Sequence, residues 1–245
     1  MEDHRAWMKD LFHTGKYSDI DLISDTKLYK AHRSIVCSMS PVIDRSCEFN
    51  AAKIDRVEPQ GNGSDHRTAR ASFNFGDADP EAVECLVQFL YLWDYEVVTA
   101  ISSDAPDEDI LREDDDYSPV TEKETTLEAR LLILHAKVFT LAHMYDIPRL
   151  GELCIKKFKG VAQQQWKSSY FLDAAREAYT ATPTDILEMR KAIVEIFYEN
   201  RALLDESRVQ AFLLEIPQLI LDIALYMNKP PTPFFGDAGD RWTFR

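Results

Sequence analysis

Strict alternation of polar and apolar residues predicts a small sheet in the first third of the chain. Residues 17–23 alternate, the turn formers Ser-Asp-Thr follow them, and residues 28–32 form a second run, which together predict a hairpin. After residues 55–69, which are rich in turn formers, residues 71–75 again place apolar side chains on one face. Three short strands are therefore expected.

A short amphipathic helix is predicted before the hairpin, over residues 4–13. Trp7, Met8, Leu11 and Phe12 recur there at helical spacing and give the helix an aromatic face.

Helical periodicity dominates the rest of the chain. The clearest start is Asp79-Pro80, which combines a capping carboxylate with proline at the first helical position. The other expected helices are one or two turns from Arg33 to Ser40, a short one carrying Val42 and Ile43, a pair that begins near Leu127 and breaks at residues 146–148, and segments near 168–179, 184–200 and 217–228. No strand is predicted beyond residue 162.

The negative charge of the chain is concentrated in one segment. The formal net charge is −14, and residues 101–128 carry eleven Asp or Glu against Arg112 and Lys123. We therefore expect residues 101–124 to form an acidic surface insert that is dispensable for folding. A negative field repels phosphate backbones, and no run of Lys or Arg supplies the usual footprint of nucleic-acid binding, so direct nucleic-acid recognition is disfavoured.

Sequence motifs for metal or group-transfer chemistry are lacking. The four cysteines, Cys37, Cys47, Cys85 and Cys154, form no CxxC pair, so we expect structural thiols and no zinc site. GxSxG, HExxH and GxGxxG do not occur, and the carboxylates of residues 107–118 lack the central Gly and terminal Glu of a calcium loop. We expect no enzyme, no cofactor and no metal.

The stretch from residue 18 to residue 41 brings His32, Cys37 and several serines together in sequence, and this cluster could be catalytic or structural. A Cys–His nucleophile pair would need both groups within about 3 Å of each other. On one helix, five residues rotate the two side chains about 140° apart, which points them away from each other. We therefore favour a packed, hydrogen-bonded histidine and a buried thiol.

The N-terminal residues MEDHRAWMKDLF lack the apolar core of a signal peptide, and no run of about eighteen apolar residues occurs. A cytoplasmic or nuclear protein without a membrane partner is expected.

Three separated blocks resemble, in order, the BTB/POZ domain in the variety common among fungal proteins. They are GKYSDIDLI…KLYKAHRSIVCSMSPV, DADPEAVECLVQFLYLWDYEV and HAKVFTLAHMYDIPRLGELCIKKF, within residues 10–160. The resemblance implies an α+β fold with a small sheet capped by helices, followed here by an all-α extension. It divides the chain into a BTB/POZ-like domain at 1–160, a helical extension at 161–228, which we expect to pack onto that domain, and a flexible tail at 229–245.

The resemblance implies a non-catalytic protein–protein interaction module that mediates self-association and partner docking. Many family members dimerise by packing their first helix against that of the partner, which would place Trp7, Leu11 and Phe12 in the interface. Asp19 and Arg33 occupy the positions of a charged pair at that interface. A homodimer is therefore expected, and the alternative is that the aromatic stripe folds back onto its own core.

The resemblance also allows a substrate adaptor of a cullin-3 ubiquitin ligase. Such adaptors often carry a hydrophobic-x-Glu element, which Val120 and Glu122 fit, and the surface around residues 115–150, including Tyr145, would contact the cullin. A transcriptional or chromatin-associated scaffold is the alternative function, and an enzyme with an unrecognised site is the third.

Overall fold

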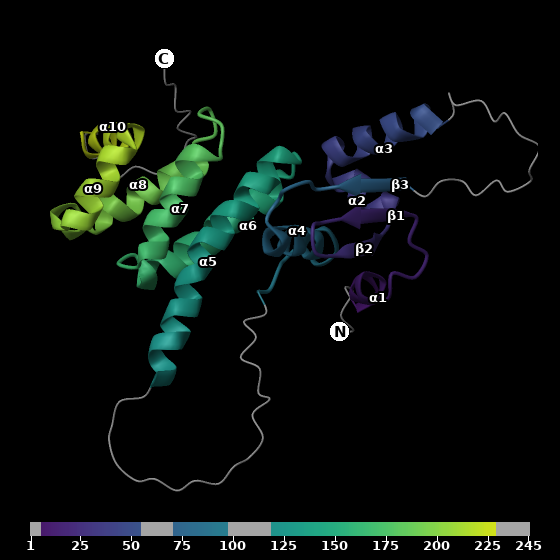
Figure 1. Ribbon diagram of the computed structural model, residues 1–245, viewed down its shortest axis with the longest axis horizontal. Helices are drawn as coiled ribbons and strands as arrows, with labels where there is room; N and C mark the ends of the chain where they lie inside the picture. Colours follow the sequence, from purple (N-terminus) through teal and green to yellow (C-terminus); the bar gives the residue numbers. More distant parts are fainter. Residues whose placement is uncertain (1–5, 55–70, 98–118, 229–245) are drawn as a thin grey trace, which may run out of the picture.

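The protein combines a small sheet and its flanking helices with a longer run of helices (Figure 1). The computed structural model describes residues 6–54, 71–97 and 119–228, and within residues 50–54 and 119–126 it describes the backbone alone. The elements are, in chain order, α1 (Ala6–Thr14), β1 (Ile20–Ile23), β2 (Leu28–Ala31), α2 (Arg33–Met39), α3 (Pro41–Ile54), β3 (Ala71–Asn74), α4 (Pro80–Leu92), α5 (Pro119–Met144), α6 (Pro148–Gln165), α7 (Ser169–Thr180), α8 (Glu188–Glu199), the 3-10 helix η1 (Arg201–Asp205), α9 (Ser207–Glu215) and α10 (Pro217–Met227). The α+β class predicted from the sequence is confirmed.

The three strands form one mixed sheet in the order β2-β1-β3. β1 and β2 make the predicted antiparallel hairpin, in which Ile20 lies opposite Ala31. β3 runs parallel to β1, with Ala71 beside Ile20. β2 and β3 are therefore the edge strands, and β2 carries the edge next to α1.

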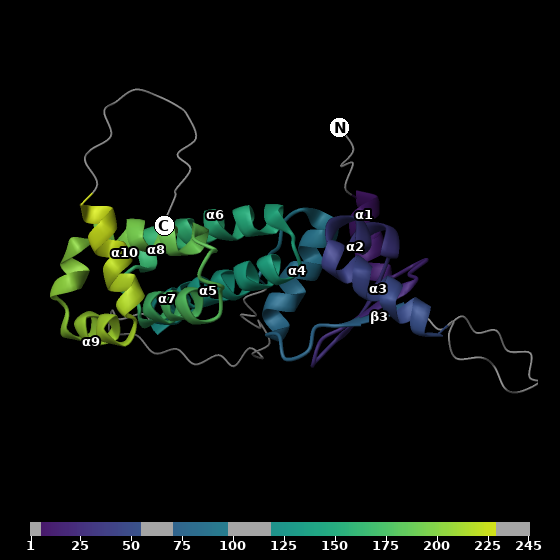
Figure 2. The same cartoon turned by 90° about the horizontal axis from the view of Figure 1, so that it is seen from above.

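The molecule is elongated, with the sheet at one end and α9 and α10 at the other (Figure 1). α5 and α6 lie side by side between the two ends in both views (Figures 1 and 2). One cluster of buried apolar residues runs through the whole molecule, from Ile20 in β1 to Ile223 in α10. α7 packs along α5, so the expectation that the helical extension packs onto the preceding part is confirmed. The boundary drawn between residues 160 and 161 falls inside α6.

Three elements differ from the sequence-based expectation. α5 begins at Pro119 and not near Leu127, so the last residues of the predicted insert are helical. Proline is favourable at the first position of a helix. The polar residues that follow it show no apolar periodicity, so the sequence did not predict this start. α3 is a helix of 14 residues, longer than predicted. η1 and α9 were not predicted. α9 buries only Val209 and Phe212, and two apolar positions are too few to show a helical periodicity in the sequence. Residues 55–69, 101–118 and 229–245 lie outside the described part of the chain.

Within the described ranges no single helix combines the length and apolar composition needed to cross a membrane, and only the pair α9 and α10, bent by 109°, meets these criteria jointly.

Asp79 caps α4 as predicted and also ties it to α5. One carboxylate oxygen accepts hydrogen bonds from the backbone N–H groups of Glu81 and Ala82, at 3.0 and 3.2 Å. The other accepts from the ammonium group of Lys137 in α5, at 2.6 Å. Burial raises the pKa of Asp79, but these donors outweigh burial and hold that pKa below its ordinary value. The charged form of Asp79 is thus the form that the fold stabilises.

Replacing Asp79 by alanine removes both the helix cap and the ion pair. We expect Asp79→Ala to lower the free energy of unfolding by about 1–2 kcal/mol in urea titration. The matched control is Asp77→Ala, because Asp77 is exposed just before the cap, and its effect should stay within about 0.5 kcal/mol. Equal effects of the two substitutions would contradict the capping role.

Candidate protein-interaction surface

The residues of the predicted aromatic stripe of α1 differ in how far they are buried. Leu11 and Phe12 are half-buried against the core, and the ring centroid of Phe12 lies 5.5 Å from that of Tyr91 in α4. Trp7 lies in the first turn of the helix, and 61% of its surface is exposed. Phe12 is thus an anchor within the chain, and Trp7 is available to a partner.

Gly15 allows the end of α1 to lie directly on β2. Its φ of +60° is in the left-handed region, and a Cβ atom at this position would stand 2.7 Å from the Cβ of Lys30. The N–H of Gly15 donates to the carbonyl of Leu11, which closes the helix. α1 is therefore held at a fixed place beside the edge strand.

His32 is a structural histidine that joins the hairpin to α4. Its Nε2 lies 2.7 Å from the carbonyl oxygen of Lys16, and its Nδ1 lies 2.8 Å from the hydroxyl of Tyr91. A carbonyl only accepts, so Nε2 carries the hydrogen and Nδ1 accepts from Tyr91. The hydroxyl of Tyr91 in turn accepts from the backbone N–H of His32 at 3.0 Å.

Cys37 is not the partner of His32 in a nucleophilic pair. Both ring nitrogens of His32 are occupied by Lys16 and Tyr91. Burial, with Cys47 and Asp44 nearby, raises the pKa of the Cys37 thiol to about 11, so the thiol is protonated near neutral pH. The structural interpretation of this cluster is confirmed, except that Cys37 is half-buried and not fully buried.

Asp19 and Arg33 are in contact, but through the backbone of Arg33. One carboxylate oxygen of Asp19 accepts the backbone N–H of Arg33 at 2.7 Å. His32 precedes α2, and its side chain makes no capping bond. The exposed carboxylate of Asp19 therefore serves as the cap of α2, a role that the sequence did not predict because Asp19 is remote from the start of that helix.

An open groove of about 790 Å³ lies between α1, β2 and α4. Its lining includes Phe12 and His13 from α1, Lys30 from β2, and Gln88 and Tyr91 from α4. The lining combines aromatic rings with polar groups, which suits a peptide better than a purely apolar ligand.

Backbone groups of β2 face away from the sheet beside this groove. In an antiparallel pair of strands, residues that exchange backbone hydrogen bonds alternate with residues that do not. The N–H of Ser24 donates to the carbonyl of Lys27, so the next residue of β2 that bonds to β1 is Tyr29. Leu28 and Lys30 therefore point their N–H and C=O groups outward, where the described residues offer no hydrogen-bond partner. Such an edge can accept an added strand.

Tyr145 belongs to the core and does not form an accessible contact. Its side chain is only 5% exposed, and its ring packs at right angles to those of Phe73 and Phe75. Its backbone carbonyl accepts the hydroxyl of Ser40 at 2.6 Å. The prediction of Tyr145 as a cullin contact is therefore wrong, because the end of α5 closes over β3. Val120 and Glu122 lie in the first turns of α5, and their side chains are outside the described residues.

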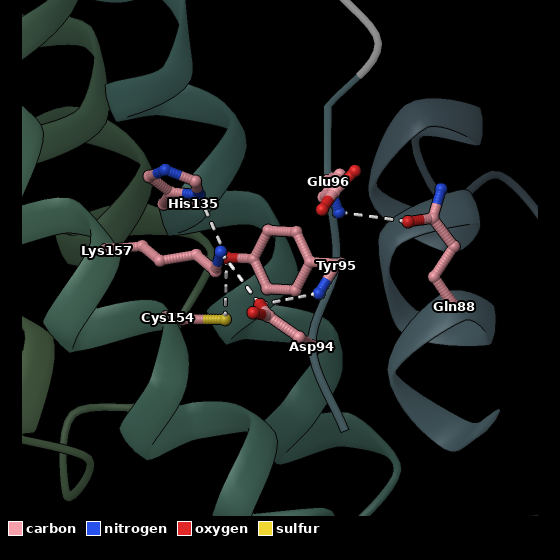
Figure 3. A network of polar contacts seen from close by, with 7 residues as sticks. All are labelled: Gln88, Asp94, Tyr95, Glu96, His135, Cys154 and Lys157. Carbon is pink, nitrogen blue, oxygen red and sulfur yellow. Dashed lines mark hydrogen bonds and ion pairs between the residues drawn. The ribbon is translucent and has the colours of Figure 1, made fainter. Parts of the chain in front are cut away.

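A polar network with a buried centre, which the sequence did not reveal, joins the segment after α4 to α5 and α6 (Figure 3). The hydroxyl of Tyr95 lies 2.9 Å from Nδ1 of His135 and 3.5 Å from the sulfur of Cys154. The ammonium of Lys157 sits 4.8 Å from the centre of the Tyr95 ring and pairs with Asp94 at 2.8 Å. His135 and Cys154 follow Tyr95 by 40 and 59 positions in the sequence, so no local sequence pattern predicts these contacts.

The surroundings of this network keep His135, Cys154 and Tyr95 neutral. Burial, helped by the charge of Lys157, lowers the pKa of His135 to about 4. Burial raises the pKa of Cys154 to about 12 and that of Tyr95 well above its ordinary range. Such groups are poor nucleophiles and bases near neutral pH, so the network fixes the packing of the helices. Among the described residues no group of three His, Cys, Asp or Glu side chains is arranged to hold a metal ion.

His135 makes stability depend on pH. The unfolded chain binds a proton on this residue below pH 6.5, whereas the folded protein resists protonation until about pH 4, so its contribution is complete above pH 6.5 and is lost as pH falls toward 4. We expect the stability advantage of the wild type over His135→Gln, measured by urea titration, to shrink by up to about 3 kcal/mol between pH 7 and pH 4. The pH dependence that carboxylates contribute is the same in both proteins and cancels in this stability difference. A stability difference that stays constant from pH 7 to pH 4 would contradict the lowered pKa of His135.

The comparison with known families agrees with this architecture. The family model of the BTB/POZ domain matches residues 8–117, a shorter stretch than the 10–160 of the sequence resemblance. A search of curated proteins found no match. The matched part begins in α1, contains the sheet, the groove and α4, and ends before α5. Residues 8–117 are therefore similar to the BTB/POZ domain, a protein-interaction module; here this part contains a three-stranded sheet with helices, and an all-helical C-terminal region follows it.

Proposed function

We propose that the protein is a non-catalytic scaffold that forms a homodimer through α1 and the β1–β2 hairpin and docks other proteins. The observation that carries this proposal is the exposure of Trp7 on a helix that has no buried residue. Tyr17, which is 79% exposed, lies in the short connection between α1 and β1. Exposed apolar residues gathered in one region usually mark an interface.

A two-fold axis suits this surface. In an isologous dimer the same patch meets its own copy, so each Trp7 would pack against the first helix of the partner. α1 is already fixed by Phe12 and Gly15, so little ordering entropy is lost when it binds. The groove beside β2 then remains the place for a different protein, which would add a strand to the exposed edge.

Trp7→Glu should convert the dimer to a monomer in light scattering, because it places a charge in the apolar contact. Phe12 is not a suitable target, since its ring packs on Tyr91 and its loss would disturb the fold. The control is Leu214→Glu, because Leu214 is an apolar residue on α9 at the far end that is at least as exposed as Trp7, and this change should leave the dimer intact. A wild-type protein that scatters as a monomer of 28.2 kDa at tens of micromolar would end this proposal.

A cullin-3 adaptor role is the second candidate. Within the surface predicted around residues 115–150, Met144 at the end of α5 is 56% exposed, beside the buried Tyr145. Met144→Glu should weaken binding of the purified protein to the N-terminal region of cullin-3 at least tenfold in calorimetry, and Leu214→Glu should not. If the wild type fails to bind at micromolar concentration, the adaptor role is excluded.

A role as a transcriptional or chromatin-associated scaffold, the likeness to the fungal variety of the domain, and a cytoplasmic or nuclear location stay predictions. Microscopy of the tagged chain tests the last of these.

A further inference from the structure

α10 is apolar on nearly its whole circumference. Leu219 and Ile223 are buried against α8 and α9. Ile220, Leu221 and Leu225, on the other side, are between 40% and 51% exposed. A helix that is apolar all round is normally buried all round. Within the described part of the chain, this second side of α10 therefore lacks the cover that its composition requires.

The exposed residues form one face, from which the chain also leaves the helix. Ile220, Leu221, Ala224 and Leu225, here called the outer face, fall within about 140° of one another at 100° per residue. Asn228 follows Ala224 by four positions and Leu225 by three, so it lies over the same face. Its N–H donates to the carbonyl of Ala224 and closes the helix there.

The residues that follow α10 in the sequence have the composition and reach to cover this face. Three prolines occur between residues 229 and 233, directly before Phe234 and Phe235. Proline-rich segments extend about 3.1 Å per residue, so residues 229–233 span about 15 Å. α10 has 11 residues and is about 16 Å long. A chain that turns back at Asn228 thus brings the two phenylalanines alongside the far end of the outer face.

We propose that Phe234 and Phe235 dock on the outer face of α10 in the same molecule. Two phenyl rings supply the large apolar area that the exposed leucine and isoleucine side chains need. A short tether also gives the pair an effective concentration in the millimolar range. In a micromolar solution of the protein, this effective concentration is far above the concentration of other molecules of the chain. The tethered segment therefore outcompetes a second copy for the outer face.

Photo-crosslinking in the full chain tests this docking. In a variant where a benzophenone amino acid replaces Phe235, irradiation should link residue 235 to Ile220 or Leu221. Cleavage after Glu215 and Asp222 releases residues 216–222, so the link appears in mass spectrometry as this peptide joined to the one that carries residue 235. The product should run as a monomer on a denaturing gel.

Two further variants show whether the outer face is the site. Leu221→Ser with Leu225→Ser should lower the yield of the link at least fivefold, and circular dichroism should show an unchanged fold because both residues are exposed. Leu214→Ser, an exposed leucine on α9 outside the outer face, should leave the yield unchanged. A link to any other part of the chain, no link, or a covalent dimer would overturn the proposal, and the dimer would assign the face to a second copy.

Discussion

A sheet of three four-residue strands cannot bury a core by itself, and the packing of α4 and α5 on it is the constraint on which the rest of the structure depends. Ile20 and Leu22 of the central strand are fully buried, which requires helices over that face. α4 supplies eight buried residues and packs against α5, and α5 then carries α6 and α7. The helical region is therefore part of the support of the sheet, which explains why a single hydrophobic cluster extends through the molecule.

The polar contacts of the interior are concentrated where these layers meet. Asp79 binds Lys137, Tyr95 lies against His135 and Cys154, and the hydroxyl of Ser40 donates to the backbone carbonyl of Tyr145, directly after α5. Apolar packing alone tolerates sliding of one helix over another, whereas a buried polar pair is costly to leave unmatched. No side-chain nitrogen or oxygen buried in the described residues lacks a partner. These contacts thus fix how the domain and the helical region sit against each other.

The local signals in the sequence predict the local structure well. Alternation located the strands, and the pair Asp79-Pro80 located the start of α4, because backbone geometry and capping act between near neighbours. The start of α5 was missed because its first turns are polar. Tyr145 was misjudged as a surface residue because its burial depends on β3, which is remote in the chain. The same distance in sequence hid the contact of Tyr95 with His135, which only the folded chain reveals.

The exposed Trp7 of α1 and the outer face of α10 are two apolar surfaces that belong to elements at opposite ends of the elongated molecule (Figure 1). This separation constrains how both surfaces are used. A self-complementary patch at one end gives a closed dimer. Two such patches at opposite ends would instead join subunits without limit, because each added copy would present another free end. A chain that self-associates through α1 therefore needs a cover for α10 that is not a second copy. A segment tethered to Asn228 meets that need and leaves the groove beside β2 open to a different protein.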